Sequence, residues 1–172
     1  LTQTLTNADL FWRNSGVSMN SAQDVNYDPS NANGSGGVRL YWLTLIGEAL
    51  IETGQMELAT SLVQRIMSVQ TQVLKTNKRF SEFYHSDQAE GLGEPANVSG
   101  IVPLHLLLRV LGIRIISSHK VWVGGSFTWG QPVTVRQHGV VIERRVDSTT
   151  ITFPNDYTTQ VSGDDWQEVT DT

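Results

Sequence analysis

Two consecutive segments with helical periodicity constrain the fold of this chain most. From Val38 to Thr53, apolar residues fall on nearly every side of a helix, and from about Met56 to Thr76 they fall on one face. Gly54 stands between the two segments, where a glycine commonly ends a helix in the left-handed conformation. The sequence therefore predicts a buried helix joined by a tight turn to an amphipathic covering helix, the αα-hairpin arrangement.

The apolar pattern changes in the second half of the chain. The run from Ile101 to Gly112 predicts a second inner-type helix, but from Arg114 the period becomes two. Five β-rich segments, separated by turn residues, predict an antiparallel meander: 120–123, 133–137, 140–146, 149–153 and 157–161. The acidic end, Ser162 to Thr172, is expected to fray apart from Trp166.

Residues 1–37 are rich in Asn, Asp, Gly and Pro, which predicts a long ordered loop or a linker after a short strand or frayed helix. Its one strongly apolar island contains Phe11 and Trp12. Aromatic side chains in such a loop either stack on the face of a ligand or plug a core, and both interpretations stay open.

Residues 80–95 place a carboxylate between aromatic residues and then a glycine-punctuated acidic loop. If Glu82 were desolvated among Phe80, Phe83 and Tyr84, its pKa would rise, and the group would suit proton transfer. The alternative is a solvated glutamate at a helix end, with aromatic side chains packed beneath it. A partner carboxylate, Glu94 or Asp87, can also be proposed for glycoside hydrolysis, which uses two carboxyl groups.

Composition excludes several classes of function. The chain has 172 residues, a net charge of −5 and no cysteine, and no cluster of Lys and Arg marks a surface for nucleic acid or anionic membrane. No apolar run reaches the roughly 20 residues of a membrane span. The four histidines lack the spacing of a metal site: His85, His105, His119 and His138. We therefore expect no metal, no cofactor, no nucleic acid and no membrane, and the compartment stays open.

The order of motifs resembles the C-terminal part of six-hairpin, α/α-toroid glycosidases, and most closely the trehalase, processing α-glucosidase and mannosylglycerate hydrolase group. The family's segment before its inner helix falls on Gly36, Val38, Trp42, Leu45 and Ile46. Its E-x-Y motif falls on Glu82-Phe83-Tyr84, and its following glycine-rich motif on Gly91, Gly93 and Glu94.

This resemblance implies mainly α-helical hairpins (a partial toroid, residues 1–116) followed by a small antiparallel β appendage (117–172). It also implies a fragment of an inverting glycoside hydrolase for α-glucoside-type substrates, with Glu82 as the general base. The general acid, an Asp, would lie upstream, and we expect the polypeptide to continue there. The expected sugar-binding residues are Phe11, Trp12, Trp42, Tyr84 and Glu94.

A different class of function fits the same residues. The chain is then a non-catalytic helical-plus-β module that binds carbohydrate or a protein partner. Because an incomplete toroid leaves apolar helix faces uncovered, the expected partners are a carbohydrate and either the upstream polypeptide or a second copy in a homodimer.

Overall fold

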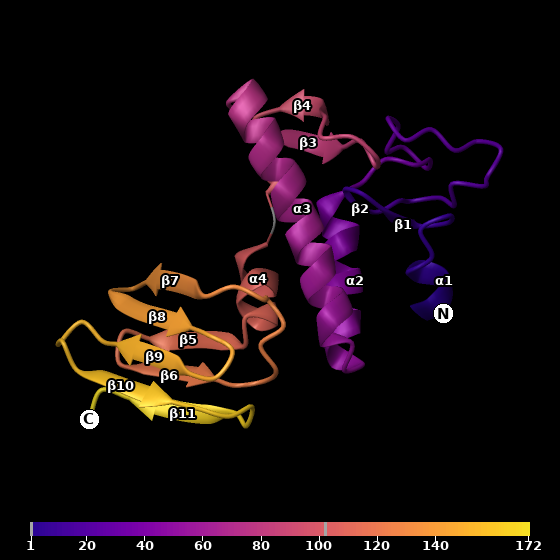
Figure 1. The fold of residues 1–172 in the computed structure, drawn as a ribbon. Helices are drawn as coiled ribbons and strands as arrows, with labels where there is room; N and C mark the ends of the chain where they lie inside the picture. Colours follow the sequence, from indigo (N-terminus) through magenta and orange to yellow (C-terminus); the bar gives the residue numbers. More distant parts are fainter. Residues whose placement is uncertain (1, 102) are drawn as a thin grey trace. The chain divides into compact units, whose positions relative to one another are not determined.

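The computed structural model describes residues 2–101 and 103–172, and contacts divide the chain into two compact units between Leu106 and Leu107 (Figure 1). Residues 1 and 102, both within the expected 1–116 segment, lie outside the described part. Over these described residues, the structure has 29% helix and 26% strand, with four α-helices and 11 strands in four sheets. The prediction of mainly α-helical hairpins is therefore wrong.

The N-terminal unit contains one helical hairpin and two small β-hairpins. Its elements are α1 (Thr2–Leu5), β1 (Trp12–Arg13), β2 (Gly16–Val17), α2 (Leu40–Glu52), α3 (Met56–Asn77), β3 (Ser81–Tyr84), β4 (Gly91–Pro95), the 3₁₀ helix η1 (Val98–Gly100) and the start of α4 (Leu104–Val110).

The α2–α3 hairpin is the element that the sequence predicted best. Both helices lie within two residues of their expected ends, and Gly54 between them has a φ of 75°, in the left-handed region. Leu43 on α2 is buried, as are Leu62 and Val63 on α3, so the two helices share an apolar core.

The segment after α3 is a β-hairpin, not the expected loop. Strands β3 and β4 pair antiparallel, with Phe83 opposite Leu92 and Tyr84 opposite Gly91. Val38, just before α2, forms a bridge with Tyr84 through two backbone hydrogen bonds of 2.8 and 3.0 Å. This bridge fixes the hairpin to the start of α2.

The long segment between β2 and α2 is held by polar contacts. The Asp28 N–H donates to Ser35 Oγ at 2.7 Å, and the hydroxyls of Tyr27 and Ser86 are 2.7 Å apart. Arg13 Nε and Asp87 Oδ1, also 2.7 Å apart, form an ion pair between β1 and the turn that joins β3 to β4. The segment is thus a loop fastened to the β3–β4 hairpin.

The C-terminal unit is built from two antiparallel sheets. One has the strand order β11-β6-β5 and the other β10-β9-β8-β7. Their bounds are β5 (Ile113–Ser117), β6 (Lys120–Val123), β7 (Val133–Gln137), β8 (Val140–Arg144), β9 (Thr149–Thr152), β10 (Thr158–Val161) and β11 (Gln167–Thr170).

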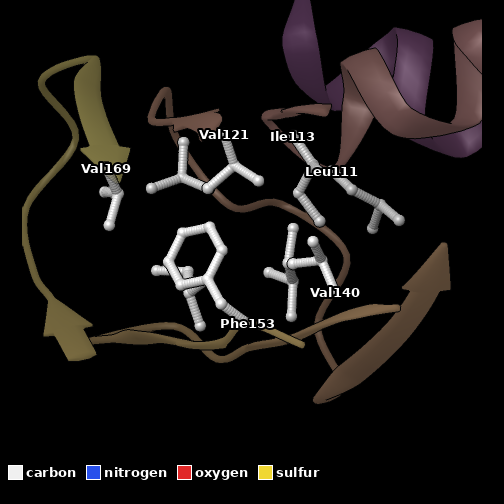
Figure 2. Close-up of a cluster of buried hydrophobic side chains, with 9 residues drawn as sticks. Leu111, Ile113, Val121, Val140, Phe153 and Val169 are labelled. Carbon is white, nitrogen blue, oxygen red and sulfur yellow. The ribbon is translucent and has the colours of Figure 1, made fainter. Parts of the chain in front are cut away.

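Inward-facing side chains of both sheets form one core (Figure 2). Ile113, Val121 and Val169 lie on strands of the first sheet. Val140 is the first residue of β8 in the second sheet, and Phe153 directly follows β9 of the same sheet. The expected β appendage therefore has a core of its own. The expected fraying of the last residues is also wrong, because Val169 on β11 pairs with Val121 on β6.

Candidate functional site

The N-terminal unit contains a cavity of about 410 Å³, within the size range of ligand pockets. It is lined by residues of α1, of the β1–β2 region and of α2: Thr4, Leu5, Phe11, Val17, Ser18, Met19, Trp42 and Ile46. Two aromatic residues that the sequence singled out separately, Phe11 and Trp42, are thus brought together at one site.

Helical spacing and a glycine position the cavity walls. Trp42 and Ile46 are four residues apart on α2 and so share a face. The β1–β2 hairpin approaches this helix closely at Gly16, where a Cβ would lie 2.7 Å from Leu43 Cδ1. Gly16 also has a φ of 135°, which side chains disfavour, so only glycine fits here without strain.

A run of large apolar side chains continues from the cavity across the surface of α2. Tyr41, Trp42 and Leu45 are 51%, 44% and 58% exposed, and we call them the apolar face of α2. The rings of Tyr41 and Trp42 contact each other with centroids 5.1 Å apart. The sequence predicted that α2 would be buried on nearly all sides, and on this face that prediction is wrong.

Glu82 lies on β3 with both carboxylate oxygens engaged. Oε1 is 3.0 Å from Arg39 Nη1, and Oε2 accepts the Glu94 N–H at 3.1 Å. These hydrogen bonds, first the one from the Glu94 backbone and then the one from Arg39, hold the pKa of Glu82 below its ordinary value. The expected rise in pKa is wrong because hydrogen bonds to the charged form outweigh desolvation.

Phe83, the aromatic residue after Glu82, contacts the arginine that pairs with Glu82. The Arg39 guanidinium lies 5.3 Å from the centre of the Phe83 ring, a cation–π distance. Glu94 is exposed on β4, and its Oε2 accepts a hydrogen bond from Asn97 Nδ2 at 3.3 Å. The catalytic role of Glu82 and the binding role of Glu94 stay predictions.

The other two expected binding residues are buried. The Arg65 guanidinium lies over Trp12, 5.6 Å from the centre of the Trp12 ring, and Arg65 also donates to the Arg13 carbonyl at 2.9 Å. The Tyr84 hydroxyl donates to the Gly100 carbonyl at 2.7 Å, and burial raises the pKa of Tyr84. Both side chains hold elements of the unit together, and neither is among the described residues that line the cavity.

The sequence analysis missed part of the cavity wall. Val17 ends β2 and Met19 lies two residues beyond it, and two-residue strands have no period long enough to read, although Gly16 is a signal for a tight backbone approach. The helical pattern assigned Ile46 and Trp42 to different sides of α2, whereas their spacing of four residues places both on one wall.

Within residues 2–101 and 103–172, no group of three or more His, Asp or Glu side chains is arranged to hold a metal ion. None of the helices in this part of the chain has the length and apolar character that would let it cross a membrane.

Comparisons with models of protein families, with curated proteins and with solved structures find no match to this chain. The resemblance to six-hairpin glycosidases is therefore not supported by any relative. The fold also contradicts it, because the described residues form mostly small antiparallel sheets with four α-helices instead of a toroid of helical hairpins.

Proposed function

We propose that this chain is a non-catalytic binding module, and that a second copy of the chain covers the apolar face of α2. The observation that carries the proposal is the exposure of Tyr41, Trp42 and Leu45 side by side on one helix, next to an apolar cavity. Contiguous exposed apolar side chains mark interaction surfaces, and Trp and Tyr are enriched among residues that dominate binding energy.

The same helix carries both a projection and a hollow. Leu45 and Tyr41 project from α2, whereas Trp42 and Ile46, further around the helix, line the cavity together with Phe11. A two-fold symmetric interface brings the same surface of both copies together, so it needs a surface that is complementary to itself. A projection beside a hollow satisfies this requirement, because each copy can insert Leu45 into the cavity of the other.

The cavity suits an apolar group better than a sugar. Among the described residues of its wall, the hydroxyl-bearing ones are Thr4 and Ser18, and Ser18 Oγ already donates to the Asn20 carbonyl at 2.7 Å. A sugar ring buried there would lose water from its hydroxyls with few new hydrogen bonds, which costs free energy. An aliphatic side chain has no such cost.

Glu82 lends less support to the catalytic alternative. A general base must accept a proton from water, but a lowered pKa makes the carboxylate a weaker base. Its two oxygens accept hydrogen bonds from Arg39 and from the Glu94 backbone, and both hydrogen bonds favour the charged carboxylate over the protonated form that a general base must reach.

Light scattering during gel filtration, over a roughly hundredfold concentration range, tests the proposal, because a dimer responds to mass action. We expect a dimer for the unaltered chain. Leu45→Glu would bury a carboxylate without a partner at the interface, and we expect a monomer. Val25→Glu adds the same charge at a residue that is 95% exposed in the same unit, and this control variant should stay dimeric.

A monomer at every concentration would contradict the proposal. An equal dimer fraction for Leu45→Glu and Val25→Glu would contradict it as well. Because Leu45 is largely exposed, its replacement should leave the circular dichroism spectrum unchanged, and this separates lost association from lost folding.

A further inference from the structure

The three-stranded sheet β11-β6-β5 has an outer face that is unlike its core face. Val121 on β6 and Val169 on β11 point into the core, and successive side chains of a strand alternate between faces. The outer face therefore carries the alternate residues. On the central strand β6, Trp122 lies between the core residues Val121 and Val123. Trp122 is 36% exposed.

The strand register places opposite charges on both sides of this tryptophan. Trp122 pairs directly with Arg114 on β5 and with Glu168 on β11, and both of these residues are exposed. Neighbouring strands lie about 4.8 Å apart, so the two charged residues flank the indole from adjacent strands. Lys120, two residues before Trp122, forms an ion pair of 3.0 Å with Glu168.

A second tryptophan extends the same face. Trp166 immediately precedes β11, two residues before Glu168, and is 51% exposed. Its Cα lies against Gly124, where an added Cβ would be only 2.6 Å away, so the strand register makes its backbone diagonal to Trp122, and its indole lies beside Gly125, 3.9 Å from a Cβ added there. Diagonal neighbours of this kind are about 7–8 Å apart, within reach of aromatic side chains.

We infer that this outer face, formed by Trp122, Trp166, Arg114 and Glu168, is a binding site for a neutral oligosaccharide. One face of a sugar ring presents C–H groups that stack on an indole, and its rim presents hydroxyls that both donate and accept hydrogen bonds. Arg114 supplies donors only and Glu168 supplies acceptors only, so the two sides of the tryptophan complement hydroxyls in both roles. The second tryptophan is placed to stack on a neighbouring ring.

Other ligands fit this face less well. A purely apolar protein surface would have to remove water from Arg114 and Glu168 without replacing it, which is costly. A charged polymer of either sign would meet a like charge on this face, Glu168 for an anionic polymer, and Arg114 and Lys120 for a cationic one. A neutral ligand rich in hydroxyls avoids both costs.

Affinity electrophoresis of the full chain in gels that contain pullulan, dextran, xyloglucan or galactomannan tests the inference. We expect retardation by at least one of these neutral polymers and none by alginate, which is anionic. Trp122→Ala should weaken the binding about tenfold or more, as for a central aromatic contact, and Trp166→Ala should weaken it less. Val25→Ala removes an almost fully exposed apolar side chain from the other unit, away from the apolar face of α2, and should leave the retardation unchanged.

Absence of retardation in all four neutral gels would overturn the inference, and so would equal retardation of Trp122→Ala and the unaltered chain. Arg114→Ala gives a second test, because loss of a hydrogen-bonding side chain should weaken binding while the unfolding temperature stays the same. Dimerisation does not depend on this face, so failure here leaves the role proposed for α2 standing.

Discussion

Replacement of the buried Arg144 is the sharpest test of how the C-terminal unit is held together. Arg144 is the last residue of β8 in one sheet and only 3% exposed. Its Nη1 donates to the carbonyls of Gly112 at 2.7 Å and Gly124 at 2.8 Å, and its Nη2 donates to the carbonyl of Gly125. All three acceptors flank strands of the other sheet, so one guanidinium joins the two sheets.

The expected loss follows from these contacts. Arg144→Met would leave the carbonyl oxygens of Gly124 and Gly125 without this donor, at about 1–2 kcal/mol each, whereas the Gly112 carbonyl still accepts the Gly124 N–H at 3.0 Å. Burial also lowers the pKa of Arg144, so removal of the charge recovers part of that cost. We therefore expect the free energy of unfolding to fall by about 2–4 kcal/mol, which for a unit of this size lowers the melting temperature by more than about 10 °C.

Calorimetry of the full chain should resolve this change, because the two units can unfold in separate transitions. The neighbouring Arg145 offers a matched control: it is exposed, and its nearest carboxylate, on Glu143, is 3.9 Å away. Arg145→Met should change the free energy of unfolding by no more than about 0.5 kcal/mol. If the two variants differ by less than about 1 kcal/mol, the reasoning about Arg144 is refuted.

Three further predictions concern the N-terminal unit. Because the pKa of Glu82 is lowered from near 4.5, its stabilising effect is present above that value and is lost as the pH falls through the lowered pKa. Urea titrations at about pH 7 and pH 3 should show Glu82→Gln less stable than the unaltered chain at pH 7, and by a smaller margin at pH 3. Tyr84→Phe should lower the free energy of unfolding by only about 1 kcal/mol, because Gln70 also donates to the Gly100 carbonyl; a loss above about 3 kcal/mol would contradict this. Gly16→Ala should cost about 1–3 kcal/mol in the same titration, since its Cβ would overlap a side chain of α2, and an unchanged midpoint would show that the hairpin shifts freely.

The sequence predicted those elements whose pattern is long enough to read. Helices α2 and α3 each span several turns, and β6 and β7 match their predicted ranges because both are rich in valine and are bounded by turn residues. The two-residue strands β1 and β2 have no readable period. β4 contains two glycines and a proline, which indicate a loop, and its pairing with β3 overrides that local preference.

The candidate site was predictable in parts but not as a whole. Phe11 and Trp42 were identified as separate aromatic residues, but their meeting in one cavity depends on the approach of β2 to α2 at Gly16. The direction of the Glu82 pKa shift was missed because its two hydrogen-bond donors, the Glu94 N–H and Arg39, lie 12 and 43 residues away in the chain. Contacts this distant in sequence are set by tertiary structure and leave no local signal.

The pairing of β6 with β11 has a consequence for how the C-terminal unit folds. β5 and β6 form a local hairpin, but the other edge of β6 gains its partner only from the last strand, so this sheet depends on a contact of long sequence separation. Until β11 arrives, the central strand has unpaired backbone groups beside an apolar surface, a combination that invites pairing with other chains. Slow or truncated synthesis should therefore favour aggregation that begins at β6.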